Sequence, residues 1–133
     1  MVFLPPVVRY FVLCQDLLID PAQPSDASIV KLIHSVHSPS EPPFPYELDL
    51  LCAFASLSNC RGTGEIDVCI VEADSSNQVH RMGPLSITFG QDPLRVFGLP
   101  IRLRRCVFPN AGLYWVQLRY NGREIAQQDL LVR

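Results

Sequence analysis

The 133-residue chain has no large excess of positive or negative charge and no long apolar run, and it contains almost no lysine. Eleven basic and thirteen acidic side chains give a formal net charge of -2, which argues against a general electrostatic affinity for nucleic acid or anionic membranes. Lys31 is the single lysine, so any basic function depends on arginine. No stretch approaches the roughly 20 apolar residues of a membrane-spanning helix. We therefore expect no membrane as a partner, and nucleic acid is an unfavoured one.

Hydrophobic residues make up 48% of the chain and charged residues 18%, a balance that is typical of a folded protein with a sizeable core. The length predicts one domain over residues 1–133. Twelve prolines are too many for a helical bundle, because each one fixes φ and removes a backbone donor.

The N-terminal stretch predicts a buried strand rather than a signal peptide. It has no basic start, Pro5 and Pro6 interrupt its apolar run, and Arg9 lies in the middle. The chain has five cysteines, and an odd count without repeated spacing favours reduced thiols in a cytoplasmic protein. One disulfide stays open as an alternative.

Alternation with period two dominates the chain, and no long helical stripe is present. The clearest strands cover residues 65–72 and 113–120, and Asn121-Gly122 predicts a type I′ turn after the second. A short helix at 16–19 is an alternative. Further strands are expected near residues 7–14, 28–36, 46–58, 84–90 and 101–108, and a last strand runs from residue 123 through residues 129–132. About eight strands predict an all-β, antiparallel β-sandwich, either immunoglobulin-like or a C2-like Greek key.

The sequence Gly112-Leu113-Tyr114 resembles the tyrosine corner of such sandwiches, in which the phenol bonds to backbone a few residues upstream. If so, Tyr114 faces the core with Val116 and Leu118. Trp115 and Arg119 then point to the opposite face of the sheet.

Several segments together resemble a family of small uncharacterised bacterial proteins. These segments are Phe11–Asp16, Ile29–Ile33, Pro43–Pro45, Gly62–Ile70, Gly112–Tyr114, Asn121-Gly122 and Leu130–Val132. The opening Cys14-Gln15-Asp16 stands where that family usually has Cys-Asp-Asp. The resemblance implies a single-domain β-sandwich and carries no activity that transfers to this chain.

No motif for catalysis, metal binding or a cofactor stands out. His34 and His37 would point to opposite faces of a strand, and the chain has neither a Cys-x-x-Cys nor a His-Glu-x-x-His pattern. Arg61-Gly62-Thr63-Gly64 leads into a strand, so we interpret it as a hairpin turn or bulge rather than a phosphate loop. We expect no cofactor.

One candidate interaction surface combines Trp115 with Arg102, Arg104 and Arg119, on the assumption that two strands bring them together. Such a patch suits a carboxylate-bearing protein partner, and less readily a single-stranded nucleic acid. The alternative is that residues 101–108 form a solvated edge strand protected by charge. Trp115 is an interface anchor, or it is covered by the proline-rich segment 39–45 through Phe44 or Tyr46.

The leading functional hypothesis is a non-enzymatic protein-interaction or accessory module, with an unidentified protein partner or self-association. A purely structural subunit of a larger assembly is the second form of that hypothesis. The alternative from another class is a small enzyme with a dispersed cysteine and histidine site, such as a thiol hydrolase.

Overall fold

The computed structural model describes residues 5–23, 26–92 and 94–133, and the described residues form strands without any helix. It follows that no helix in this part of the chain is long and apolar enough to cross a membrane. The strands are β1 (Val7–Ile19), β2 (Ala27–Leu32), β3 (Ser35–Val36), β4 (Tyr46–Ser58), β5 (Gly62–Glu72), β6 (Gln78–Gly90), β7 (Phe97–Phe108), β8 (Gly112–Tyr120) and β9 (Arg123–Val132).

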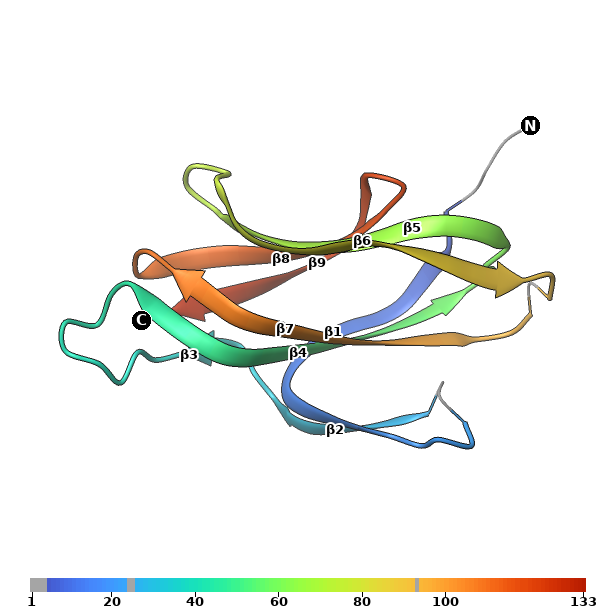
Figure 1. Ribbon diagram of the computed structural model, residues 1–133, viewed down its shortest axis with the longest axis horizontal. Coiled ribbons are helices and arrows are strands. Elements are labelled where there is room, and N and C mark those ends of the chain that lie inside the picture. The colour runs from blue at the N-terminus through green and yellow to red at the C-terminus, as the bar shows by residue number, and fades with distance from the viewer. Residues whose placement is uncertain (1–4, 24–25, 93) are drawn as a thin grey trace.

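The strands form two sheets that lie one above the other (Figure 1). One sheet has the order β2-β1-β4-β7 and the other the order β3-β9-β8-β5-β6. All pairings are antiparallel except that of β3 with β9. The all-β, mostly antiparallel class predicted from the alternation is therefore confirmed.

The main core lies between the two sheets because both turn an apolar face inward. Leu51 and Ile101 come from the four-stranded sheet, and Ile66, Val68 and Val116 from the five-stranded sheet. All of them are buried, and they belong to one continuous cluster. This shared core joins the two sheets into one domain-sized unit.

A second, smaller cluster lies on the outer face of the four-stranded sheet, where the hairpin of β1 and β2 packs against it. Cys14 and Leu17 of β1 meet Cys52 and Phe54 of β4 there, with Ala27 of β2 beside them. Figure 1 shows β2 set apart on this side of β1 and β4. The guanidinium of Arg102 on β7 donates a hydrogen bond of 3.1 Å to the Leu17 carbonyl oxygen, which ties this hairpin to the sheet.

Several local predictions are confirmed. The strand predicted at residues 46–58 has these bounds as β4. Asn121 and Gly122 have φ values of 50° and 81°, as a type I′ turn requires. The Tyr114 hydroxyl donates a hydrogen bond of 2.7 Å to the Asn110 carbonyl oxygen, which is the contact of a tyrosine corner.

Other predictions are wrong in detail. Residues 16–19 continue β1, so the alternative of a short helix there is wrong, whereas the last strand expected from residue 123 through residue 132 is β9. The strand expected over residues 28–36 is two strands, because β2 pairs with β1 whereas β3 pairs with β9 in the other sheet. Regular alternation places Arg105 on the same face as Leu103, yet Leu103 is buried and Arg105 exposed. Arg105 has a φ of 56°, which interrupts the alternation.

Candidate functional site

A hollow with a volume of about 830 Å³ lies between the β1–β2 hairpin and the outer face of the four-stranded sheet. We call it the hairpin groove. Its lining is mostly apolar and comes from three strands and two adjoining loops: Arg9, Tyr10, Val12, Asp26, Ala27, Ile29, Leu32, Phe54, Ser56 and Val96. A hollow of this size and composition accommodates several side chains of a bound segment.

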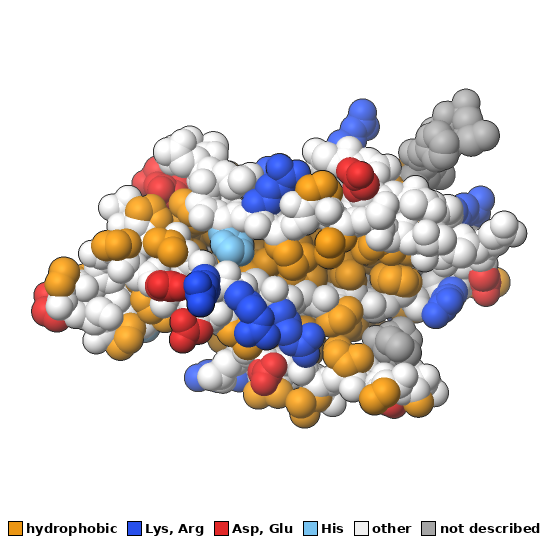
Figure 2. Space-filling model, in the orientation of Figure 1, with side chains coloured by type: hydrophobic (Ala, Val, Ile, Leu, Met, Phe, Trp, Pro, Cys, Tyr) orange, Lys and Arg blue, Asp and Glu red, His pale blue; other side chains and the backbone are white. Residues whose placement is uncertain are grey.

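The strand β2 borders this groove and is an edge strand, because among the described residues it pairs only with β1. Ile29, Val30 and Leu32 of β2 are exposed, at 39%, 38% and 55% of their surface. Figure 2 shows apolar side chains along this side of the molecule. An exposed apolar edge offers unpaired backbone groups to an added strand, and soluble proteins normally protect such edges.

The groove has a basic end. A neighbouring hollow of about 450 Å³ shares Arg9 and Val96 with it and adds Arg61, Asn59 and Ser58. The lining of this second hollow contains no carboxylate among the described residues. Beyond the other side of the hairpin lies an acidic hollow of about 680 Å³, which is lined by Asp16, Glu47 and Asp49 among others. The two ends of the hairpin region therefore differ in the sign of their charge.

The structure does not bring the predicted surface together. Arg102 and Arg104 lie on β7 at the edge of the four-stranded sheet, whereas Trp115 and Arg119 lie on β8 inside the five-stranded sheet. Strands β7 and β8 follow each other along the chain but cross from one sheet to the other, so their outer faces lie on opposite sides of the molecule. The prediction of one Arg/Trp patch is therefore wrong, while the alternative of an edge strand at 101–108 is confirmed.

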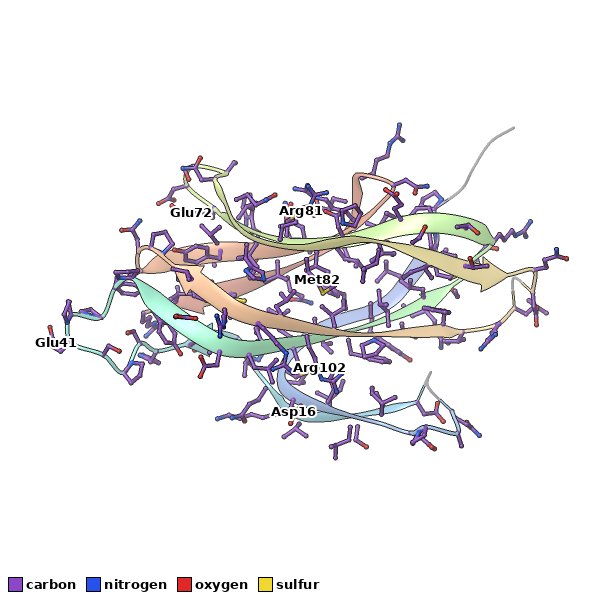
Figure 3. All side chains as sticks on the ribbon, viewed as in Figure 1. Asp16, Glu41, Glu72, Arg81, Met82 and Arg102 are labelled. Atoms are coloured by element: carbon purple, nitrogen blue, oxygen red, sulfur yellow. The ribbon has the colours of Figure 1, made fainter. Side chains whose placement is uncertain are left out.

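Arg102 and Arg104 also differ from each other in their contacts. Arg102 bonds to the Leu17 carbonyl oxygen, so it positions the hairpin that forms one wall of the groove. Arg104 is exposed. Figure 3 labels Arg102 and Asp16, which lie close together between β7 and the hairpin.

Trp115 and Arg119 belong to a polar face on the outer side of the five-stranded sheet. Asp67, only 3% exposed, lies opposite Arg119 on β5 and forms an ion pair of 3.3 Å with Arg81. Arg119 donates a hydrogen bond of 3.1 Å to the Gln117 side-chain oxygen. Trp115 is partly exposed, and Phe44 and Tyr46 pack against the main core on the other side of the sheet.

The cysteines and histidines form no activated nucleophile in the part of the chain that the structure describes. Burial raises the pKa of the Cys106 thiol to about 12 and that of Cys14 to about 11, which favours the unreactive thiol form. Cys69 donates a hydrogen bond of 3.4 Å to Asp67 rather than to a histidine. His34 and His37 are exposed, and burial lowers the pKa of His80.

Sequence reasoning missed the hairpin groove because its walls meet only through long-range pairing. A signal was nevertheless present in the strand predicted at 28–36. Ile29 and Val30 are adjacent apolar residues that break the alternation, so at least one of them had to face solvent or a partner.

The architecture defines an all-β domain of two facing sheets, and comparison with known proteins adds a likeness in fold. No protein-family model matches the chain, and no match was found among curated proteins. A similar solved structure is the alkylpurine DNA glycosylase AlkC of Pseudomonas fluorescens, bound to DNA containing an abasic site analog. The alignment has a TM-score of 0.54 and 10% identity, and covers 96% of this chain and 30% of that one. At this identity the likeness concerns the fold alone.

Proposed function

We propose that this chain is a non-enzymatic protein-interaction module that binds an extended, apolar segment of a partner protein in the hairpin groove. One observation carries the proposal: a mostly apolar hollow of about 830 Å³ lies beside the exposed apolar edge of β2. Neither feature contributes to the main core, which is complete between the two sheets.

An extended segment suits both features at once. Its backbone groups would pair with the free edge of β2, and alternate side chains would then point into the groove beside Val12 and Phe54. Main-chain hydrogen bonds supply affinity in this mode of binding, while the apolar side chains supply specificity.

The charges around the groove define the chemistry of the partner further. Arg9 lines both the groove and the neighbouring hollow, which also contains Arg61. A carboxylate at one end of the bound segment complements these two arginines. The expected ligand is therefore an extended peptide with apolar residues at alternate positions and an acidic residue at one end.

We also propose that the two sheets have the immunoglobulin-like form of the Greek-key sandwich. The order β9-β8-β5-β6 in one sheet, and β1-β4-β7 in the other, supports this form. The tyrosine corner at Tyr114 and the parallel pairing of β3 with β9 agree with it. Membership of the bacterial family and a cytoplasmic location are proposals that rest on sequence resemblance and on the odd number of cysteines.

The binding proposal is tested by selecting peptides from a random linear library on the purified full chain. We expect the selected peptides to alternate apolar residues and to include an acidic residue. The double substitution Ile29→Ser/Leu32→Ser should weaken their binding about tenfold or more, because it removes two exposed groove side chains without opening the core. Leu85→Ser is the matched control, since Leu85 is 50% exposed on β6, an edge strand of the other sheet.

Three outcomes would overturn the proposal. The first is a selection that gives no peptide binders, and the second is binding that survives the double substitution unchanged. The third is that the chain binds short single-stranded DNA, rather than peptides, in a manner that depends on Arg104 and Arg105. That result would favour nucleic acid, the partner class of the DNA-bound structure described above.

A further inference from the structure

Two of the five cysteines face each other across neighbouring strands. Cys14 of β1 and Cys52 of β4 are register partners in the antiparallel ladder, and both are fully buried. They lie in the small cluster beneath the β1–β2 hairpin, outside the main core. Cys60 and Cys106 belong to the main core, and Cys69 lies on the outer face of the other sheet.

Directly opposite residues in an antiparallel ladder project their side chains to the same face, with Cα atoms about 4.5–5.5 Å apart. A disulfide needs a Cα separation of about 4.4–6.8 Å. The backbone positions of Cys14 and Cys52 therefore meet the main requirement for a bond without rearrangement of the sheet. None of the other cysteines has a cysteine as its register partner.

Charged groups near both sulfur atoms act on this pair. Burial raises the pKa of both thiols, and the charge of Asp16 acts in the same direction, while the positive charge of Arg102 opposes this rise in part. The charge on Cys52 also raises the pKa of Cys14, which agrees with the proximity of the two sulfurs. Arg102 is the same side chain that bonds to the Leu17 carbonyl oxygen and positions the hairpin.

We propose that Cys14 and Cys52 are a reversible thiol–disulfide exchange site, which a small-molecule disulfide such as oxidised glutathione converts into a cross-strand bond. This proposal does not rest on the proposed peptide-binding function. It assigns a redox modification to the underside of the hairpin, next to Val12 and Phe54 of the groove.

The exchange proceeds in two displacements. One thiol loses its proton and attacks the glutathione disulfide, so that a mixed disulfide forms and one glutathione leaves as its thiolate, which takes up a proton. The second cysteine then loses its proton, displaces the other glutathione and closes the Cys14–Cys52 bond. Overall, two cysteine thiols are oxidised, and one glutathione disulfide is reduced to two thiols.

Access to the pair requires the hairpin to move, because both sulfur-bearing residues are buried beneath it. The Arg102 contact with Leu17 and the packing of Leu17 hold the hairpin in place. Oxidation of the folded chain should therefore be slow. Leu17→Ala should accelerate it several-fold, because it removes packing that holds the hairpin and leaves the charge of Arg102 in place.

The test measures which bond forms once access no longer limits the reaction. The full chain is unfolded in urea and refolded in buffers of defined ratios of oxidised to reduced glutathione, and free thiols are then alkylated. Intact-mass analysis should show three alkyl groups instead of five together with the loss of two hydrogens, and peptide mapping should join the peptide of Cys14 to that of Cys52. Cys14→Ser and Cys52→Ser should each abolish this species. Cys69→Ser is the control that should retain it, because serine can still donate to Asp67.

The proposal is overturned if the refolded chain retains all five thiols at every ratio. It is also overturned if the bond joins other cysteines, or if only mixed disulfides with glutathione accumulate. An oxidation rate of the folded chain that Leu17→Ala does not raise would refute the part of the proposal that makes hairpin opening the limiting step. None of these outcomes involves peptide binding, so they are independent of the test of the groove.

Discussion

The hydroxyl of Tyr114 is a single group that holds the loop between β7 and β8 through two hydrogen bonds. It donates to the Asn110 carbonyl oxygen at 2.7 Å and accepts from the Asn110 amide at 3.4 Å. The ring is buried and packs edge-on against Phe108, with the ring centroids 4.9 Å apart. The hydroxyl therefore connects the loop between β7 and β8 to the core.

We predict that Tyr114→Phe lowers the free energy of unfolding by about 1 kcal/mol, because it removes the hydrogen bond and keeps the ring. Urea denaturation of the two chains measures the difference. Tyr46→Phe is a suitable control, since the Tyr46 ring also stacks on Phe108, with the centroids 6.3 Å apart, and its hydroxyl has no such bond to the loop. Equal losses for the two variants would contradict a specific role of the tyrosine corner.

Residues such as Tyr114, Asn121 and Gly122 are predictable from the sequence because their conformations depend on nearby backbone. The turn at Asn121 needs only positive φ at two positions. Arg105 is different. Its φ of 56° lies where few residues other than glycine and asparagine occur, and the two consecutive arginines Arg104 and Arg105 give no local reason for it. The change of face after Leu103 could therefore not be predicted.

At the scale of elements, the β1–β2 hairpin is the part of the molecule that we expect to open first. It packs on one side only, against a small cluster, and Arg102 holds it through one hydrogen bond. The strands β5 and β8 lie in the interior of their sheet and contribute to the main core. Local openings of low free energy are typical of peripheral elements with few buried contacts.

Arg102→Gln should therefore accelerate amide hydrogen exchange in residues 14–23 and 26–32 and leave exchange in β5 and β8 unchanged. Hydrogen exchange read by mass spectrometry measures both regions in one experiment. The matched control is Arg104→Gln, which removes the same charge from an exposed position two residues along the strand. If Arg104→Gln accelerates exchange in the hairpin equally, the effect comes from charge and not from the bond to Leu17.

The alternation of residues predicted most strand positions, but it did not predict which strands pair. Residues 28–36 have the composition of one strand, and their division into β2 and β3 follows from pairing with different sheets. For the same reason, the expected patch of Trp115 and Arg102 was wrong: adjacent strands in the chain can belong to different sheets. The hairpin groove depends on the same long-range information, so only its exposed apolar residues could be anticipated.

At the scale of the whole molecule, the buried thiols make the free energy of unfolding depend on pH in the alkaline range. Burial raises the pKa of Cys60, Cys69 and Cys52 as well as that of Cys14 and Cys106, and it acts in the same direction on Tyr46 and Tyr114. In the unfolded chain these thiols ionise near their usual pKa of 9.0, whereas the folded chain keeps them protonated. Above that pH the unfolded state binds fewer protons, so the free energy of unfolding decreases as the pH rises.

We predict that the stability contributed by these protonated thiols is fully present below about pH 8 and is lost progressively as the pH rises through 9.0 toward about 12, the pKa of folded Cys106. Urea denaturation at about pH 7.5 and about pH 10.5 should show a loss of roughly 2 kcal/mol or more. Cys106→Ala should lose less between the two pH values, although it starts from a lower stability. An unchanged free energy of unfolding in the wild-type chain would mean that its thiols ionise as readily in the fold as outside it, and that their environment is not apolar.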